Sequence, residues 1–372
     1  MVNPSRAPNL PALTGLRFFA ALAVLDVHFG RWLPPTGPLH TLVGRGSFAV
    51  SLFFVLSGFI LAYTYATPDS TLRGTAGAFY RARFARIYPV YLTGLLLALA
   101  TPDPFYPNTP RALALLPTLA LVQSWLPSLV QAINGPGWSL SAEAFFYALF
   151  PLLLRTCLRM GTRQRIGLIA VLWLGSALVQ HQAALVGAGE TLDILPLARL
   201  PEFLIGILAC GIWSARRRHE WGARRCDLVA VSSIGSALLV LGYAPDAWNQ
   251  VLLTGGLAPL WALLLYALAT GRGTITRTLG CRPLATLGAA SYSLYILHWP
   301  LWCALAAFSG TPSWTLLHVP WFFGMYMLIA IACSVLAHRY VEEPGRRALR
   351  GTHRARPRAL PAPVREDRAA IP

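Results

Sequence analysis

Apolar segments separated by short Arg-rich stretches repeat along the whole chain, and between successive basic stretches they come in pairs. Most are close to the ~20 apolar residues that cross a bilayer as a helix. We predict about ten membrane-spanning helices: Leu13–Phe29, Gly46–Ala66, Ile87–Ala100, Trp138–Leu154, Gly167–Val186, Pro196–Ala215, Asp227–Tyr243, Val251–Ala269, Leu284–Ala307 and Leu316–His338. The pattern therefore predicts an all-α, polytopic membrane helix bundle.

The Arg-rich stretches predict how the bundle is oriented, because loops rich in Arg and Lys stay in the cytoplasm. The stretches are Arg73–Arg86, Arg155–Arg165, Arg216–Arg225, Arg272–Arg282 and the chain from Arg339 onward. This arrangement places both termini in the cytoplasm and the protein in the cytoplasmic (inner) membrane. The Arg residues that do not fit are Arg31, Arg45, Arg111 and Arg199. The first apolar segment has no cleavage pattern after it, so we expect a retained helix rather than a signal peptide.

One further apolar segment, Ala112–Trp125, does not fit the pairing. It has about 14 residues, contains Pro117, and would reverse every later loop if it crossed the membrane. Its flanks, Thr101–Arg111 and Pro127–Gly137, are rich in Pro, Asn and Gly. We therefore expect a re-entrant or interfacial segment on the outer side, where it forms a lid or substrate loop.

Composition supports this interpretation. The chain has 372 residues, of which 55% are hydrophobic and only 12% are charged, about half the charged fraction of a soluble protein. In a membrane protein the net charge of +17 reports orientation, so we expect no nucleic-acid partner. The scattered cysteines predict neither a disulfide framework nor a metal site. We expect one integral-membrane domain over residues 1–344 and a basic, disordered cytoplasmic tail over 345–372.

Two ionisable residues, Arg17 and His28, lie inside the first apolar segment. Eleven helical steps bring both side chains to one face, about 16 Å apart along the axis. Ionisable groups in a bilayer face the protein interior or a water-filled cavity, and they are candidates for function. An N-terminal anchor with a stray Arg and a satisfied His is the alternative. Asp26 lies about 160° around the helix from His28 and has no predicted partner.

Seven blocks in chain order carry a family resemblance. They are Leu13–Arg17 followed by His28, Gly46–Phe59, Phe79–Pro89 with Arg83 and Arg86, Trp138–Tyr147, Arg199–Gly206, Gly288–Pro300 and Tyr340–Pro344. Together they resemble the bacterial type-three membrane acyltransferases, the O-antigen and exopolysaccharide O-acylases. The chain departs from the family at Thr14 and Ser51, where an Asp is common, and it lacks the esterase-like domain fused to some members.

The resemblance implies transfer of an acyl group, with acetyl expected, from acyl-CoA to a sugar hydroxyl. Acyl-CoA would be a donor substrate rather than a tightly bound cofactor. The implied acceptor is a lipid-linked exopolysaccharide or O-antigen unit, with a glycosylated small molecule such as a macrolide as the alternative. A transporter or flippase of lipid-linked sugars is the rival class, but no inverted repeat is visible in the sequence.

Acyl transfer needs a general base at the hydroxyl and a thioester held nearby. We predict His28 as the base, with Glu143 at a similar depth to orient it. Glu143 could instead be a carboxylate that stabilises a helix N-terminus. Arg83 and Arg86 suit the phosphates of coenzyme A, and Arg17 suits its pantetheine arm or thioester. Ordinary positive-inside anchoring is the alternative for the Arg pair.

Further residues are predicted to line the cavity or position substrate: Trp138, Tyr147, Arg199, Glu202, Ser291, Tyr295 and His298. Arg199 and Glu202 are three residues apart, which favours an intramembrane ion pair. Ser291, Tyr295 and His298 share one helix face, where a satisfied core network is an equal alternative. Glu342 and Glu343 are expected to pair with local Arg residues.

Overall fold

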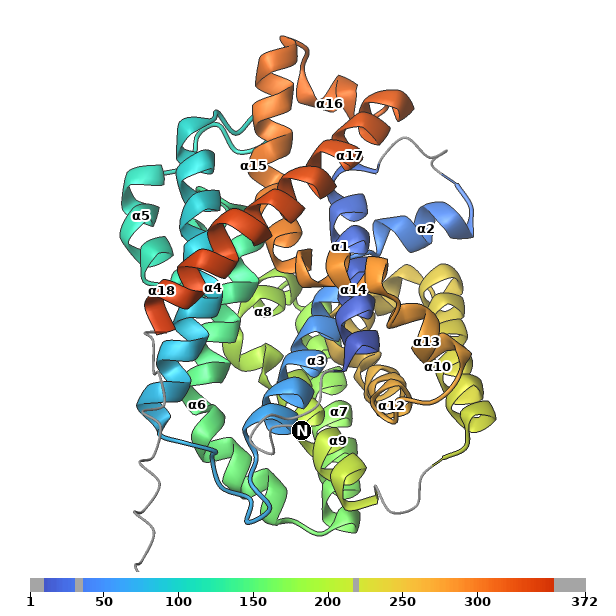
Figure 1. Ribbon diagram of the computed structural model, residues 1–372. Coiled ribbons are helices and arrows are strands. Elements are labelled where there is room, and N and C mark those ends of the chain that lie inside the picture. Colours follow the sequence, from blue (N-terminus) through green and yellow to red (C-terminus); the bar gives the residue numbers. More distant parts are fainter. Residues whose placement is uncertain (1–9, 31–35, 217–220, 351–372) are drawn as a thin grey trace, which may run out of the picture.

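The computed structural model describes residues 10–30, 36–216 and 221–350. Eight helices in these ranges are long and apolar enough to cross a membrane. They are α1 (Pro11–Phe29), α3 (Phe48–Tyr65), α4 (Ala76–Ala100), α6 (Trp138–Arg159), α7 (Thr162–Leu185), α9 (Pro196–Arg216), α10 (Ala223–Tyr243) and α17 (Pro320–Ala337), the last continuing to Arg350. The predicted all-α, multi-pass membrane bundle is confirmed, and Figure 1 shows its arrangement.

Two of the ten expected spans are broken. Residues 246–269 form two pieces bent by 43°, which count as a ninth span if taken together. They comprise η4 (Asp246–Trp248), α11 (Asn249–Val251), η5 (Leu252–Gly256) and α12 (Ala258–Ala269). The bend lies at Gly255, whose φ of +112° suits only glycine.

The expected span Leu284–Ala307 is divided between α14 (Arg282–Ala289) and α15 (Ser291–Ser309), with α13 (Thr274–Leu279) before them. The division has a packing reason: a methyl group on Gly288 would overlap the carbonyl of Thr14, so α14 lies directly against α1. Helix α15 has 19 residues, enough to cross a membrane, but it is not among the eight apolar helices found in the described ranges.

The remaining helical elements are short. They are α2 (Pro38–Gly44), α5 (Arg111–Leu119), η1 (Gln123–Trp125), η2 (Pro127–Leu129), η3 (Gly135–Gly137), α8 (Gly189–Ile194) and α16 (Ser313–Leu316). Helix α5 has nine residues, about 14 Å, which is far short of a bilayer core. After it the chain packs against the start of α6, where Ser124 Oγ donates to the carbonyl of Trp138 at 3.0 Å. Ala112–Trp125 therefore lacks the continuous helix that a span requires.

Glycine allows the central helices to approach closely. Methyl groups on Gly58 of α3 or Gly206 of α9 would overlap the backbone carbonyls of Phe203 and Val55 respectively. Such contacts between small residues are a common basis of helix association in membranes. They join α3 to α9 within the main apolar core.

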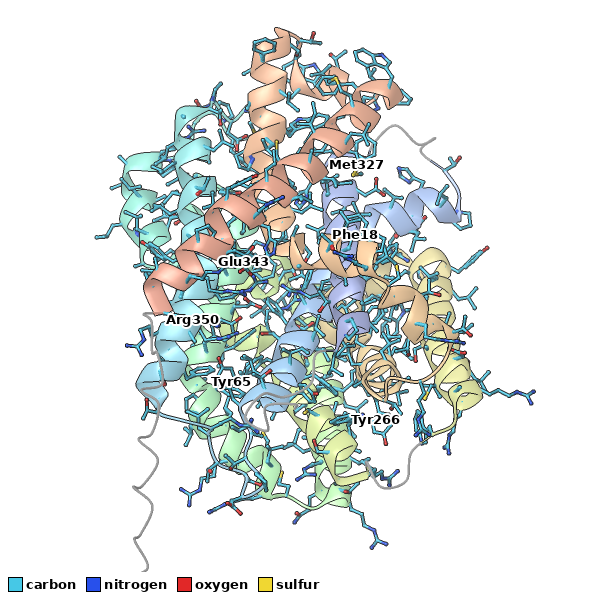
Figure 2. All side chains as sticks on the ribbon, in the orientation of Figure 1. Phe18, Tyr65, Tyr266, Met327, Glu343 and Arg350 are labelled. Atoms are coloured by element: carbon cyan, nitrogen blue, oxygen red, sulfur yellow. The ribbon has the colours of Figure 1, made fainter. Side chains whose placement is uncertain are left out.

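The C-terminal elements form one long rod across the bundle. Helix α17 continues through the π-helical turn η6 (His338–Glu342) into α18 (Glu343–Arg350), and the rod crosses α4 in Figure 1. Figure 2 places Glu343 and Arg350 along its last part. Helix α18 continues past the expected domain boundary at residue 345, and Gly345 packs against Pro89. The rest of the expected tail lies outside the described residues.

Three of the four exceptional Arg residues make specific contacts. Buried Arg45 donates to the carbonyls of Leu241 and Ala244 at 2.7 and 2.8 Å, and it pairs with Asp246. Arg111 donates to the carbonyl of Thr101 at 3.1 Å. Arg199 belongs to a buried ion pair described below, and Arg31 lies outside the described residues. These contacts explain why the residues depart from the charge pattern.

The orientation itself can be tested with reporter fusions. A reporter fused after Ala132 is expected to be extracytoplasmic and one fused after Arg163 cytoplasmic, because α6 crosses the membrane between them and α5 does not. Paired alkaline phosphatase and green fluorescent protein fusions measure this directly. A cytoplasmic signal at Ala132 would show that Ala112–Trp125 spans, and the ten-span prediction would then be wrong.

Candidate active site

A polar cavity of about 100 Å³ lies between α1, α3, α4, α6 and the start of α15. Arg17, Arg83 and Arg86 line it, together with Glu143 and Tyr147. Three guanidinium groups facing one carboxylate give the cavity a surplus of positive charge. Such a cavity suits an anionic ligand, because guanidinium groups bind phosphates and carboxylates through paired hydrogen bonds.

Aromatic rings hold Arg83 in this cavity. Its Nη2 donates to the hydroxyl of Tyr65 at 3.1 Å, and its guanidinium lies 5.3 Å from the ring centre of Tyr65 and 5.9 Å from that of Tyr147. The hydroxyl of Tyr147 donates to Glu143 at 2.9 Å. Within the described residues Arg83 thus makes its side-chain hydrogen bond to a tyrosine rather than to a carboxylate, so its charge can serve a ligand.

Arg86 is held differently, by an ion pair with Glu342 of η6. The Glu342 carboxylate is fully buried and also accepts from Ser293 Oγ at 3.0 Å. The expectation that both glutamates pair locally is half right: Glu343 pairs with Arg346, whereas Glu342 pairs with an Arg more than 250 residues earlier in the chain. Arg86 thus joins α4 to the C-terminal rod.

A second cavity of about 50 Å³ continues from the first. The two share Arg17, Glu143 and Tyr292, and the second extends to Ser139, Ser291 and Tyr295. Two of the three residues predicted on one face of α15 therefore line this cavity. The hydroxyl of Tyr295 donates to the carbonyl of Pro136 at 3.1 Å and accepts from Ser139 at 2.8 Å.

His298, the third residue of that face, lies beside His28. The two ring centres are 5.1 Å apart, and His298 Nε2 is 3.3 Å from His28 Nδ1. The ring of Tyr295 is 5.9 Å from that of His298, so the second cavity ends next to the histidine pair. The structure thus brings His28 and His298 together although 270 residues separate them.

Glu143 lies elsewhere in the site. It shares both cavities with Arg17 and is attracted to it electrostatically. Arg17 is three helical turns from His28 on α1, about 16 Å along the axis. Glu143 thus lines the Arg-rich cavity, and the side chain observed next to His28 is His298. An orienting role of Glu143 toward His28 stays a prediction.

The loop after α4 lies beside the histidine pair, within the flank Thr101–Arg111 that the sequence analysis expected to form part of an outer lid, but the role of Asp103 in it was not predicted. Buried Asp103 accepts from Trp299 Nε1 at 2.8 Å and from the backbone N–H groups of Phe105 and Tyr106. The Trp299 ring lies edge-on to His28, with 5.4 Å between centres. Burial, with a smaller contribution from Asp103, raises the pKa of Tyr106. The prolines on either side of Asp103 were the available signal for an ordered loop.

Arg199 and Glu202 form the predicted ion pair, at 2.7 Å between Nε and Oε2, with both side chains 1% exposed. Asp193 of α8 adds a second carboxylate at 2.7 Å. The Arg199 guanidinium also lies 5.6 Å from the ring centre of Trp138. Arg199, Glu202 and Trp138 thus pack as one group beside the cavities, without lining either of them.

This arrangement predicts a stability effect. Arg199→Ala leaves two carboxylates without their cation, and breaking a buried pair in this way costs about 3–5 kcal/mol. We expect little folded protein after extraction into detergent, measured by size-exclusion chromatography and thermal unfolding. Arg216→Ala is the control, since Arg216 is exposed at the end of the same helix. If Arg199→Ala were as stable as the wild type, the buried ion pair of Arg199 would not stabilise the fold.

Within the described ranges, no group of three or more His, Cys, Asp or Glu residues could hold a metal ion.

Comparison with known proteins supports acyl-transfer chemistry. A family model described as an acyltransferase domain matches residues 10–339. Acyltransferase MdmB of Streptomyces mycarofaciens is 33% identical over 332 residues, which cover 79% of each chain. O-acetyltransferase OatA of Staphylococcus aureus is 25% identical over 320 residues, which cover 78% of this chain and 50% of OatA. No solved structure matches the chain. The chain belongs to the type-three acyltransferase family, and the protein is a multi-pass membrane enzyme that transfers acyl groups.

Proposed function

We propose that the protein is a membrane O-acyltransferase that moves an acyl group, with acetyl expected, from cytoplasmic acyl-CoA to the hydroxyl of a sugar. The observation that carries this proposal is the joined pair of cavities. They begin at Arg83 and Arg86, meet at Arg17 and Glu143, and end at Tyr295 beside the two histidines. An end lined by three arginines and an end next to the two histidines thus share Arg17 and Glu143 as lining residues, which supports a path for the donor between them.

The Arg-lined end suits coenzyme A. Its phosphates are anions, and Arg83 presents donors at the end of α4 expected to face the cytoplasm. The two cavities have volumes of about 100 and 50 Å³, so the nucleotide of coenzyme A stays at the mouth and its pantetheine arm enters the cavities. Arg17 lies where the cavities meet, and there its charge would hold the pantetheine arm on its way to the histidines.

At the other end His28 acts as general base. It takes the proton of the acceptor hydroxyl while that oxygen attacks the thioester carbon. The carbon–sulfur bond then breaks, and the departing thiolate takes up the proton that His28 accepted, which leaves free coenzyme A and neutral His28. The loop pinned by Asp103 covers this end, so it is placed to exclude water that would otherwise hydrolyse the thioester.

The proposed acceptor is a lipid-linked exopolysaccharide or O-antigen unit on the outer side. The relative OatA is named an O-acetyltransferase, that is, an enzyme that transfers acetyl groups to an oxygen atom, and we propose the same chemistry for this chain. A glycosylated small molecule such as a macrolide is the alternative acceptor within the same enzyme class.

The test uses purified protein in nanodiscs with radiolabelled acetyl-CoA, together with mass spectrometry of cell-surface glycans and culture medium from strains with and without the gene. We expect free coenzyme A to form only with acceptor present, and one acetylated sugar to vanish with the gene. If the gene alters the side of the membrane on which a lipid-linked sugar lies, without any change in acylation, the protein is a transporter instead.

A further inference from the structure

The hydrogen-bond partners of His28 fix the position of its ring proton. Nδ1 lies 2.7 Å from the backbone carbonyl of Val24. A carbonyl oxygen can only accept a hydrogen bond, so this contact favours the tautomer with the proton on Nδ1. In neutral His28 the lone pair is then on Nε2.

His298 is fixed in the same way. Its Nδ1 lies 2.6 Å from the carbonyl of Tyr295, and therefore carries the proton. In the neutral ring, the remaining nitrogen, Nε2, is an acceptor, and this nitrogen lies 3.3 Å from His28 Nδ1. The Nδ1–H of His28 thus faces two acceptors, the Val24 carbonyl and His298 Nε2. In the opposite tautomer of His28, the Nδ1 lone pair would face the lone pairs of the Val24 carbonyl and of His298 Nε2.

The surroundings hold His298 in this position. Its side chain is 1% exposed, and its backbone carbonyl accepts from the hydroxyl of Tyr326 at 2.9 Å. Phe29 lies edge-on to the His298 ring, with 6.0 Å between centres. A side chain packed in this way cannot easily turn its Nε2 away from His28.

We propose that His298 is a positioning residue that keeps His28 in the tautomer with the proton on Nδ1 and the reactive lone pair on Nε2. The proposal rests on the proposed function, in which His28 is the base. When His28 Nε2 takes the hydroxyl proton, the ring becomes positively charged, and its bond from Nδ1 to His298 becomes charge-assisted and stronger. A neutral imidazole thus performs the orienting role that a carboxylate performs in a catalytic triad, without burying another negative charge.

Two variants separate this role from packing. His298→Gln keeps an acceptor near the position of Nε2, whereas His298→Leu removes it at similar volume. We expect His298→Leu to lower kcat about 10- to 100-fold, with the KM for acetyl-CoA unchanged. His298→Gln is expected to recover most of kcat. His40→Leu is the control, since His40 is exposed on α2.

A direct measurement of the tautomer makes the proposal independent of activity. Solid-state nitrogen NMR of protein labelled at histidine distinguishes protonated from unprotonated ring nitrogens, and the His28→Asn spectrum assigns the His28 signals. We expect Nδ1–H in the wild type and a mixture of tautomers in His298→Leu. A proton on Nε2 in the wild type, or an unchanged tautomer and kcat in His298→Leu, would overturn the proposal. Absence of acyl transfer by the wild type would instead count against the proposed function.

Discussion

Replacing His28 with alanine is expected to abolish acyl transfer while the protein still inserts and folds. General-base catalysis contributes about 10²- to 10⁴-fold to such reactions, and His28 lies where the cavities end beside Tyr295 and His298. Acyl-CoA binding should persist, because its proposed contacts are about 16 Å away at Arg17 and beyond. The loss should therefore appear in kcat rather than in the affinity for acyl-CoA.

The measurement is acetyl transfer by purified protein, with binding of coenzyme A followed separately by calorimetry. His40→Ala provides the control, since it removes a histidine that is exposed on α2. Near-normal transfer by His28→Ala would remove His28 from the mechanism. Equal losses of binding and folding would instead show that the substitution collapses the packing around Phe29 and Trp299.

Much of the site could be predicted because its residues are ionisable and stand within apolar sequence. Arg17, His28 and Glu143 are ionisable groups in apolar segments, and such groups must face the interior. Helical spacing placed Arg199 with Glu202, and it placed Ser291 and Tyr295 on one cavity-lining face. These inferences are local, since they need only the pitch of one helix.

The contacts between distant segments could not be predicted. Nothing along the chain indicates that Glu342 would meet Arg86, that His298 would meet His28, or that Asp103 would hold Trp299. Depth in the membrane was the only available guide, and many side chains share one depth. That is why Glu143 was assigned to His28 from depth alone, whereas the structure shows that it lines the same cavities as Arg17.

In the fold, too, the features set by local sequence could be predicted and those set by contacts between distant segments could not. Hydropathy located the long helices, because bilayer thickness sets their length. The breaks near Gly255 and after Ala289 depend instead on tertiary contacts. Gly255 lies against Glu202 of α9, and Gly288 lies against the backbone of α1. A hydropathy average cannot detect a helix end that is caused by packing against another helix.

The two Arg residues of α4 are expected to respond differently to substitution, although the sequence assigned them one role. In the described part of the chain Arg83 contacts the tyrosines Tyr65 and Tyr147, whereas Arg86 forms an ion pair with the fully buried Glu342. Arg83→Ala should weaken acyl-CoA binding about 10- to 100-fold, the loss of one charge-assisted contact, with little effect on stability. Arg86→Ala should cost about 3–5 kcal/mol of stability, because it removes the arginine that pairs with the buried Glu342 carboxylate.

Calorimetry with coenzyme A and thermal unfolding in detergent separate the two effects. Arg81→Ala is the matched control, since Arg81 is exposed on the same helix and carries the same charge. Adding Glu342→Gln to Arg86→Ala should restore stability, because both charges of the pair are then absent. The double variant Arg83→Ala, Arg86→Ala should lose more affinity for acyl-CoA than for the sugar acceptor.

Unchanged coenzyme A affinity in Arg83→Ala would show that the donor does not bind at this end of the cavity. A stable Arg86→Ala protein that no longer binds coenzyme A would show that Arg86 exchanges Glu342 for the donor phosphates, so that the C-terminal rod moves when the donor enters.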